Sequence, residues 1–141
     1  VGCYVTDFAT PEVMAMENAI VLPHLGASTE EAEDNCARMA VVELMDYIDN
    51  GNIVNSVNYP ACQAGACPDD LFRIAVLYNS SDLAMGSVIE ILEPIVAEFD
   101  MVDNQRDEHG YALITLTENL ADEVLERIAE LDGAYLVRRV K

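Results

Sequence analysis

Basic residues are scarce in this sequence of 141 residues, because seven Lys and Arg stand against 26 Asp and Glu and give a formal net charge of −19 at pH 7. A nucleic-acid-binding protein needs cationic side chains to displace counterions from phosphates. An anionic membrane surface attracts the same kind of basic patch. The charge balance therefore excludes a nucleic-acid partner and disfavours a membrane partner. The acidic residues are spread over the whole chain, which is typical of a charged, solvated surface.

Long hydrophobic runs are also absent, since no apolar segment reaches the ~18 residues of a membrane-spanning helix. No basic segment opens the chain as in a secretory signal peptide. Cysteine is limited to four residues, and the two histidines are isolated from one another. Cys62 and Cys67 form one close pair, but a zinc site needs a second pair of ligands. We expect no metal site, and reduced thiols in a cytoplasmic protein.

What is present is a globular chain, 52% hydrophobic and 23% charged. Residues 61–70 combine small and turn-forming residues without hydrophobic periodicity, a composition typical of a linker. The sequence therefore predicts a first segment over 1–60, a linker over 61–70 and a second domain over 71–141.

The first segment resembles the end of an α/β domain. Residues 2–8 and 19–23 are short apolar strands of the kind found in parallel sheets that are covered on both faces. Ser28 and Glu31 form a capping box that starts a helix extending to about Asn50. This helix is apolar on nearly all sides, so we expect it to need partners in several directions. The segment is interpreted as part of an incomplete domain.

The second domain shows a βαββαβ order, which is typical of a ferredoxin-like α+β fold. Alternating apolar spacing predicts a strand over 71–78, a hairpin over 101–116 and a last strand over 134–140. Helical apolar spacing predicts one helix over 81–95 and a second over 120–131. Ser81 or Asp82 is expected to cap the first helix, and Pro94 to kink it or end it early.

His24 is the candidate catalytic residue. It follows an apolar strand, at the carboxyl end where α/β sheets bind ligands. Gly26, Ala27 and a helix N-terminus that favours anions come directly after it. A neutral imidazole in this position could take a proton from a substrate hydroxyl if a carboxylate such as Glu12 orients it. The alternative interpretation is an ordinary polar histidine at a domain edge.

Two segments resemble a known family. Residues 23–35 (Pro-His-Leu-Gly-Ala-Ser-Thr-Glu-Glu-Ala-Glu-Asp-Asn) and 52–60 (Asn-Ile-Val-Asn-Ser-Val-Asn-Tyr-Pro) resemble the C-terminal part of D-3-phosphoglycerate dehydrogenases, within the D-isomer-specific 2-hydroxyacid dehydrogenases. Residues 71–141 resemble the ACT regulatory domain that many of these enzymes carry. The resemblance implies an NAD-dependent oxidoreductase of serine biosynthesis that acts on 3-phosphoglycerate.

The resemblance also implies roles for individual residues. His24 matches the acid/base histidine and Glu12 the glutamate that pairs with it. Asp7 matches an aspartate near the nicotinamide, and Gly26 and Ala27 match the backbone beside that ring. The substrate-binding arginine and the Gly-rich dinucleotide turn are expected upstream of Val1, so we expect these 141 residues alone to be inactive.

In the ACT-like domain, Asn79 matches an asparagine of the serine-sensing pattern, and Ser80, Ser81 and Asp82 form the adjacent turn. Asp82 replaces a glycine there and adds negative charge, which weakens the match. We expect a homodimer built through the ACT sheet or its edge and through the 29–50 helix, with serine or another amino acid as the effector beside this turn.

Three functions remain open from the sequence. The chain can be part of a 3-phosphoglycerate dehydrogenase, or of another D-2-hydroxyacid dehydrogenase such as a hydroxypyruvate reductase. It can also be a non-catalytic ACT-type amino-acid-binding or assembly module. The arginine region decides between the first two, because a phosphorylated substrate needs additional cationic groups.

Overall fold

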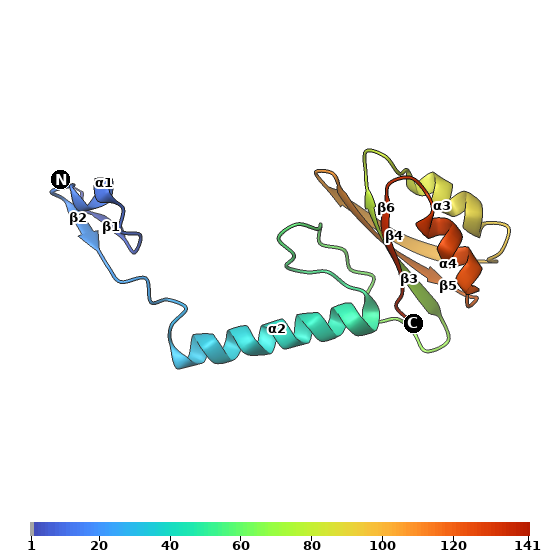
Figure 1. Cartoon of the computed structure of the whole chain (residues 1–141). Helices are drawn as coiled ribbons and strands as arrows, with labels where there is room; N and C mark the ends of the chain where they lie inside the picture. The colour runs from blue at the N-terminus through green and yellow to red at the C-terminus, as the bar shows by residue number, and fades with distance from the viewer. Residues whose placement is uncertain (1) are drawn as a thin grey trace. The chain divides into compact units, whose positions relative to one another are not determined.

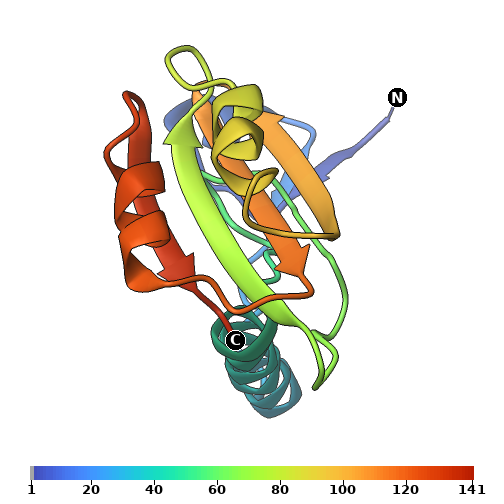
Figure 2. The same ribbon diagram turned by 90° about the vertical axis from the view of Figure 1, so that its right-hand side faces the viewer.

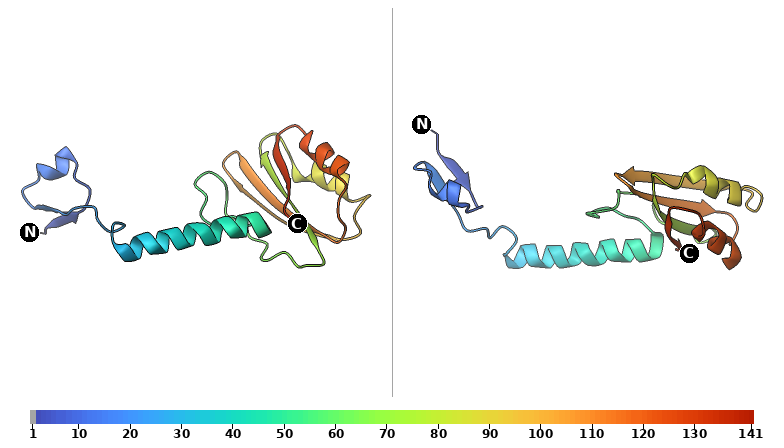
Figure 3. Two further views of the ribbon diagram at one scale, coloured as in Figure 1. Left: turned by 60° about the horizontal axis from the view of Figure 1, so that its bottom comes forward. Right: turned by 45° about the horizontal axis from the view of Figure 1, so that its top comes forward.

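The computed structural model describes residues 2–141 (Figure 1). It divides into two compact units that meet between Ala40 and Val41, and each is described by itself. The helix α2, Glu30–Asn50, contains this division. α2 is continuous along its whole length in both views of Figure 3.

The first unit contains a pair of short parallel strands. β1, Tyr4–Thr6, pairs in parallel with β2, Ala19–Val21, and the short helix α1, Pro11–Met14, lies between them in the sequence. The predicted strands are confirmed. Their apolar residues are typical of a sheet interior, although only two strands are paired here.

The start of α2 differs by one residue from the prediction. The Oγ1 atom of Thr29, not Ser28, accepts a hydrogen bond from the Ala32 amide, at 3.2 Å. This is the geometry of an N-cap, and the helix begins at Glu30. At the other end the helix stops before Gly51, whose φ of +78° suits glycine.

The second unit confirms the predicted βαββαβ order. Its elements are β3 Phe72–Asn79, α3 Met85–Leu92, β4 Phe99–Arg106, β5 His109–Leu116, α4 Asp122–Ala129 and β6 Ala134–Arg139. The strands form one antiparallel sheet in the order β4-β5-β3-β6. Figure 2 shows α3 and α4 on the same face of this sheet.

The expected cap of α3 was wrong. Ala84 occupies the N-cap position and makes no side-chain hydrogen bond. Ser81 instead donates its amide to the Asn79 side chain, at 2.9 Å, within a tight turn after β3. The helix ends at Leu92, two residues before Pro94, as predicted.

The main core lies between the sheet and its two helices. It consists of the buried residues Ile74, Val76, Tyr78, Leu83, Met85, Val88, Leu92, Val96, Ala112, Ile114, Leu116, Leu120, Val124 and Ile128. Even-numbered residues of β3 thus point to the helices, as the alternation of the strand requires.

The opposite face of the sheet has a smaller core. Cys62, Ala75, Tyr111 and Leu113 are buried there, and Tyr47, Ile53, Tyr59 and Ala64 pack against them. The covering residues belong to the end of α2 and the segment after it. Part of the sheet face for which we expected a second copy is therefore covered by this chain itself.

A buried arginine joins these parts. Arg73 on β3 is 2% exposed. Its Nη1 donates to the carbonyls of Asn50 and Gly65, at 3.0 and 2.7 Å. Its Nη2 donates to the Ala64 carbonyl at 3.2 Å, and its Nε to the Thr115 hydroxyl at 2.9 Å. We call this cluster, together with Asn50 and residues 64–67, the arginine junction.

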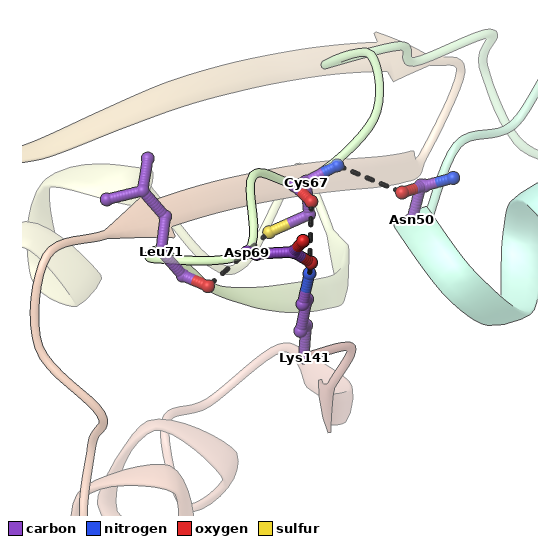
Figure 4. A network of polar contacts seen from close by, with 5 residues as sticks. All are labelled: Asn50, Cys67, Asp69, Leu71 and Lys141. Atoms are coloured by element: carbon purple, nitrogen blue, oxygen red, sulfur yellow. Dashed lines mark hydrogen bonds and ion pairs between the residues drawn. The ribbon is translucent and has the colours of Figure 1, made fainter.

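Further hydrogen bonds extend the arginine junction to the C-terminus (Figure 4). The Cys67 amide donates to the Asn50 side chain, at 2.9 Å. Lys141 donates to the Cys67 carbonyl at 3.3 Å and to Asp69 at 2.6 Å. The residues between α2 and β3 are thereby tied to both the helix end and the last residue of the chain.

Candidate active site

The parallel pairing of β1 and β2 brings their carboxyl ends together. Thr6 lies opposite Val21, and the Leu22 amide donates to the Thr6 carbonyl at 2.9 Å. Asp7 directly follows β1, and His24 lies three residues after β2. Residues at this edge of an α/β sheet are those that usually bind ligands.

His24 is in contact with two residues that follow β1. Its Nδ1 lies 2.9 Å from the Oδ2 atom of Asp7. The ring of Phe8 lies beside the imidazole, with 4.7 Å between centroids and an interplanar angle of 53°. The Phe8 amide donates to the Thr6 hydroxyl at 3.1 Å, which stabilises the turn at the end of β1.

This arrangement selects the nitrogen of His24 that is free to react. An ionised carboxylate only accepts hydrogen bonds, so Nδ1 must carry the hydrogen. In the neutral ring the lone pair is then on Nε2. Such a nitrogen can accept a proton from a hydroxyl group, and the protonated ring can return it to a carbonyl.

Glu12 lies at the start of α1 and makes no hydrogen bond to His24 among residues 2–141. Hydrogen bonds from its own backbone amide and from the Thr10 side chain lower the pKa of this exposed carboxyl group. Thr10 is also the N-cap, since its Oγ1 accepts from the Val13 amide at 3.3 Å. The structure therefore brings Asp7, rather than Glu12, to the imidazole.

Gly26 and Ala27 lie in the turn between His24 and α2. The Ser28 amide donates to the Leu25 carbonyl across this turn, at 3.0 Å. A Cβ atom on Gly26 would meet no atom within 4 Å, so the space beside the turn is open. A flat ring could approach the backbone there.

None of residues 2–40 is buried. The exposed large apolar side chains of this unit include Tyr4, Val5, Phe8, Ile20, Leu22 and Leu25. The side chain of His24 is 58% exposed. The sequence contains no Gly-rich dinucleotide turn, so the residues that would bind a pyrophosphate are not among these 141.

The candidate effector residues form one turn in the second unit. Asn79 accepts the Ser81 amide, and the Asp82 amide donates to the Asn79 carbonyl at 3.2 Å. The Ser80 hydroxyl donates to the Asp107 carbonyl at 3.0 Å. The Asn79 side-chain oxygen thus stabilises the turn.

The remaining reactive side chains, those that could bind a metal ion and the cysteines, form no further candidate site among residues 2–141. Across residues 2–141, no three His, Cys, Asp or Glu side chains gather in a way that could bind a metal ion. In the same part of the chain, all four cysteines are free thiols. Burial raises the pKa of the Cys62 thiol to about 11, which makes it a poor nucleophile. No helix in the described part of the chain is long and apolar enough to cross a membrane.

Two features of the site were missed by the sequence analysis. The contact between Phe8 and His24 has no signal in the sequence. The pairing of Asp7 with His24 did have a signal in the sequence, because Asp7 directly follows a strand that runs parallel to the strand before His24. Residues at such positions meet at the same edge of the sheet.

No protein-family model matches the chain. The chain is 43% identical over 102 residues to D-3-phosphoglycerate dehydrogenase 1 of Saccharomyces cerevisiae. The aligned residues are 72% of this chain and 21% of the yeast protein. It is 25% identical over 136 residues to D-3-phosphoglycerate dehydrogenase of Haemophilus influenzae, covering 94% of this chain and 32% of that protein. The corresponding protein of Dictyostelium discoideum is 25% identical over 130 residues, or 90% of this chain and 31% of that protein.

The resemblance deduced from the histidine motif is thus confirmed. The chain spans between a fifth and a third of the length of these relatives.

Proposed function

We propose that this chain, as a relative of the D-3-phosphoglycerate dehydrogenases, is the C-terminal part of an NAD-dependent enzyme of that kind. The intact enzyme would oxidise 3-phosphoglycerate to 3-phosphohydroxypyruvate, the first step of serine biosynthesis, in the cytoplasm. The observation that carries this proposal is the 2.9 Å contact between Nδ1 of His24 and Oδ2 of Asp7, at the carboxyl ends of two parallel strands. The similarity to dehydrogenases over most of the chain supports it.

The chemistry assigned to the chain is proton transfer. NAD, when bound, supplies the hydride acceptor. His24 takes the hydroxyl proton of the substrate through Nε2, while the C2 carbon loses its hydrogen with both bonding electrons and becomes a carbonyl carbon. In the reverse direction the protonated His24 returns the proton to the carbonyl oxygen.

The residues around His24 contribute orientation and space. Gly26 and Ala27 would lie beside the nicotinamide, where the turn leaves open space. Asp7 is close enough to contact the same region, because it pairs with His24. Binding of the dinucleotide itself is assigned to residues outside this chain, so the 141 residues alone are expected to be inactive.

We assign the second unit to regulation and assembly as an ACT-type module. Its βαββαβ topology supports the assignment. The turn over Asn79, Ser80, Ser81 and Asp82 is the proposed effector site, with serine as the first candidate. Because the Asn79 oxygen already accepts the Ser81 amide, a ligand would have to bind through the remaining groups of the turn.

The homodimer is predicted to use surfaces that remain exposed in this unit. The edge strand β6 exposes Tyr135 and Leu136. The second half of α2 exposes Val41, Val42, Leu44, Met45 and Ile48. Apolar surface of this extent marks association sites. Light scattering at physiological salt should give twice the mass of one chain, because charges more than about 8 Å apart are then largely screened and repel little. A monomer at ~100 µM in this salt would contradict the prediction.

The identity of the substrate is tested by steady-state kinetics on the intact protein. We expect kcat/KM for 3-phosphoglycerate to exceed that for unphosphorylated glycerate by at least ~100-fold, because cationic groups bind the phosphate through charge-assisted hydrogen bonds. A preference for glycerate or hydroxypyruvate would favour the other dehydrogenase class. Absence of any NAD-dependent turnover, together with binding of an amino acid, would favour the non-catalytic module.

A further inference from the structure

The end of α2, residues 47–51, is held by side chains of the four-stranded sheet in the second unit. We propose that this sheet is the C-terminal cap of α2: three of its strands each supply a donor to the final carbonyl groups of the helix, so that the state of the sheet is passed to the helix directly. The cap itself can be tested on the chain alone. Its consequence for regulation rests on the proposed function.

α2 needs donors from outside because its own last turn offers none. The final carbonyl groups of a helix have no amide partner within it. The same end carries a partial negative charge, which basic side chains in the last turn usually offset. α2 has no basic residue there. Asp46 and Asp49 lie near this end instead, and their charges oppose the helix dipole.

The last two of these carbonyl groups receive donors from the two central strands. Arg73 on β3 donates from Nη1 to the Asn50 carbonyl, at 3.0 Å. Tyr111 on β5 donates its hydroxyl to the Gly51 carbonyl, at 2.7 Å, in a buried contact. A cation and a hydroxyl group of the sheet thus take the place of the amides that the helix lacks.

The edge strand β6 supplies the third donor. Arg138 donates from Nη2 to the Tyr47 carbonyl, at 2.6 Å. Its guanidinium carbon also lies 4.4 Å from the centroid of the Tyr47 ring, a cation–π contact. In a chain with only seven basic residues, two of them, Arg73 and Arg138, are placed at the end of this one helix. Cations at this position interact favourably with the helix dipole.

Gly51 shows how closely the chain approaches the sheet. A Cβ atom at this residue would lie 2.7 Å from Cδ2 of Leu113 and 3.1 Å from Cγ2 of Val140. Its φ of +78° is also a conformation that suits glycine. The backbone that leaves α2 is therefore in direct contact with β5 and with the residue after β6.

Opening of this contact is costly because polar groups are buried in it. Among residues 2–141, the buried polar or charged side chains are those of Asn52 and Arg73. The Asn52 amide group donates to Asp46 and its oxygen accepts from the Ala64 amide, both at 2.9 Å. Separating the helix end from the sheet would break the hydrogen bonds of Arg73 and disturb those of Asn52, and unpaired buried groups are strongly unfavourable.

The first test is amide hydrogen exchange on the 141-residue chain. Helix ends normally fray, so the last amides of a helix usually exchange faster than those in its middle. For α2 we expect the reverse. Residues 47–51 should be protected at least ~10-fold more than residues 36–40, because the cap holds the former. Equal or faster exchange at 47–51 would overturn the proposal.

Removal of one donor tests the cap itself. Tyr111→Phe keeps the buried ring and removes the hydroxyl that donates to Gly51. Protection at residues 47–51 should fall by about 5- to 100-fold, the effect of a buried acceptor left without its donor, while residues 36–40 stay unchanged. The matched control is Tyr135→Phe on β6, where the side chain is 54% exposed and protection should not change. Unchanged protection at 47–51 in Tyr111→Phe would contradict the cap.

A change on the other face of the sheet tests whether its state reaches the helix. Tyr78 belongs to the main core, and its hydroxyl donates to Asp103 at 2.6 Å. Tyr78→Phe should lower the protection of β3 and of residues 47–51 by the same factor, within about 3-fold, because both open together. If β3 loses protection and residues 47–51 do not, the helix end opens independently of the sheet and the proposal is wrong.

The consequence for regulation is tested on the intact enzyme, with millimolar serine as the probe. We expect serine to lower kcat, and Tyr111→Phe to reduce this effect by at least about 2-fold while calorimetry still detects serine binding. An equal effect of serine in Tyr111→Phe and wild type would contradict transmission through the cap. No response of the wild type to serine would refute the proposed effector instead, because the exchange experiments need no serine and decide the cap by themselves.

Discussion

In the intact enzyme, His24→Asn is expected to lower kcat by about 10²- to 10⁴-fold, the contribution of a positioned acid/base group. Asparagine is similar in size and can still accept a hydrogen bond, but it cannot take a proton from a hydroxyl group. KM for NAD should change little, because the substitution removes an interaction that matters in the transition state. Steady-state kinetics with 3-phosphoglycerate measures both values.

The matched control is the other histidine. His109 begins β5 and lies 5.3 Å from Tyr59, between ring centroids, in the second unit. His109→Asn should leave kcat within a factor of ~2, a difference of about 0.4 kcal/mol in activation free energy. An unchanged kcat in His24→Asn, or an equal loss in both variants, would refute the assignment of His24.

The largest effect on stability is expected at Arg73. Arg73→Met keeps an unbranched side chain but removes the donors to the Asn50, Gly65 and Ala64 carbonyls. A buried acceptor that loses its donor costs about 1–3 kcal/mol, and neighbouring losses overlap. We expect the free energy of unfolding to fall by about 2–4 kcal/mol, measured by urea denaturation of the chain.

Two variants make the test of Arg73 specific. Arg127 on α4 is exposed, so Arg127→Met should change the free energy of unfolding by less than about 0.5 kcal/mol. Arg73→Lys keeps the charge but cannot reach all these carbonyls, and should be intermediate. In Arg73→Met, hydrogen exchange should also increase at the Ala64 and Cys67 amides, which donate to the side chains of Asn52 and Asn50. Equal stability of Arg73→Met and wild type would mean that the arginine junction is not a stabilising element.

The βαββαβ order could be predicted because each element has its own local signal. Strand and helix periodicities differ, and the hairpin has a turn at Asp107, the described non-glycine residue with positive φ, of 54°. The two capping errors have a physical cause. Thr29 and Ser28 are both good caps, and Asn79 competes for the amide of Ser81. Periodicity alone cannot decide between neighbouring polar residues.

The arginine junction could not be predicted from the sequence. Arg73 interrupts an apolar strand, and its partners lie 8 to 42 residues away along the chain. They are mostly backbone carbonyls, which carry no residue signature. The same applies to residues 61–67, whose small side chains resemble a linker although Cys62 is 1% exposed. Small residues allow a close approach of the backbone to a sheet as readily as they allow flexibility.

The candidate site rests on one position that the sequence pattern selects and on others that only the resemblance supplies. His24 could be selected because it follows an apolar strand, at the edge where α/β sheets bind ligands. Asp7 was named only through the family resemblance, as a residue near the nicotinamide. The choice of partner carboxylate depended on how the segment between the strands folds. Thr10 caps α1 and Glu12 lies in the first turn of that helix, an outcome that a fixed spacing between motif residues cannot reveal.

The most direct measurement of the central claim is the oxidation of 3-phosphoglycerate by the intact protein that contains this chain. The account predicts that NADH and 3-phosphohydroxypyruvate form in equal amounts, and that His24→Asn suppresses both products together while the protein still binds NAD. Formation of neither product by a folded, NAD-binding protein, or equal formation by wild type and His24→Asn, would contradict it.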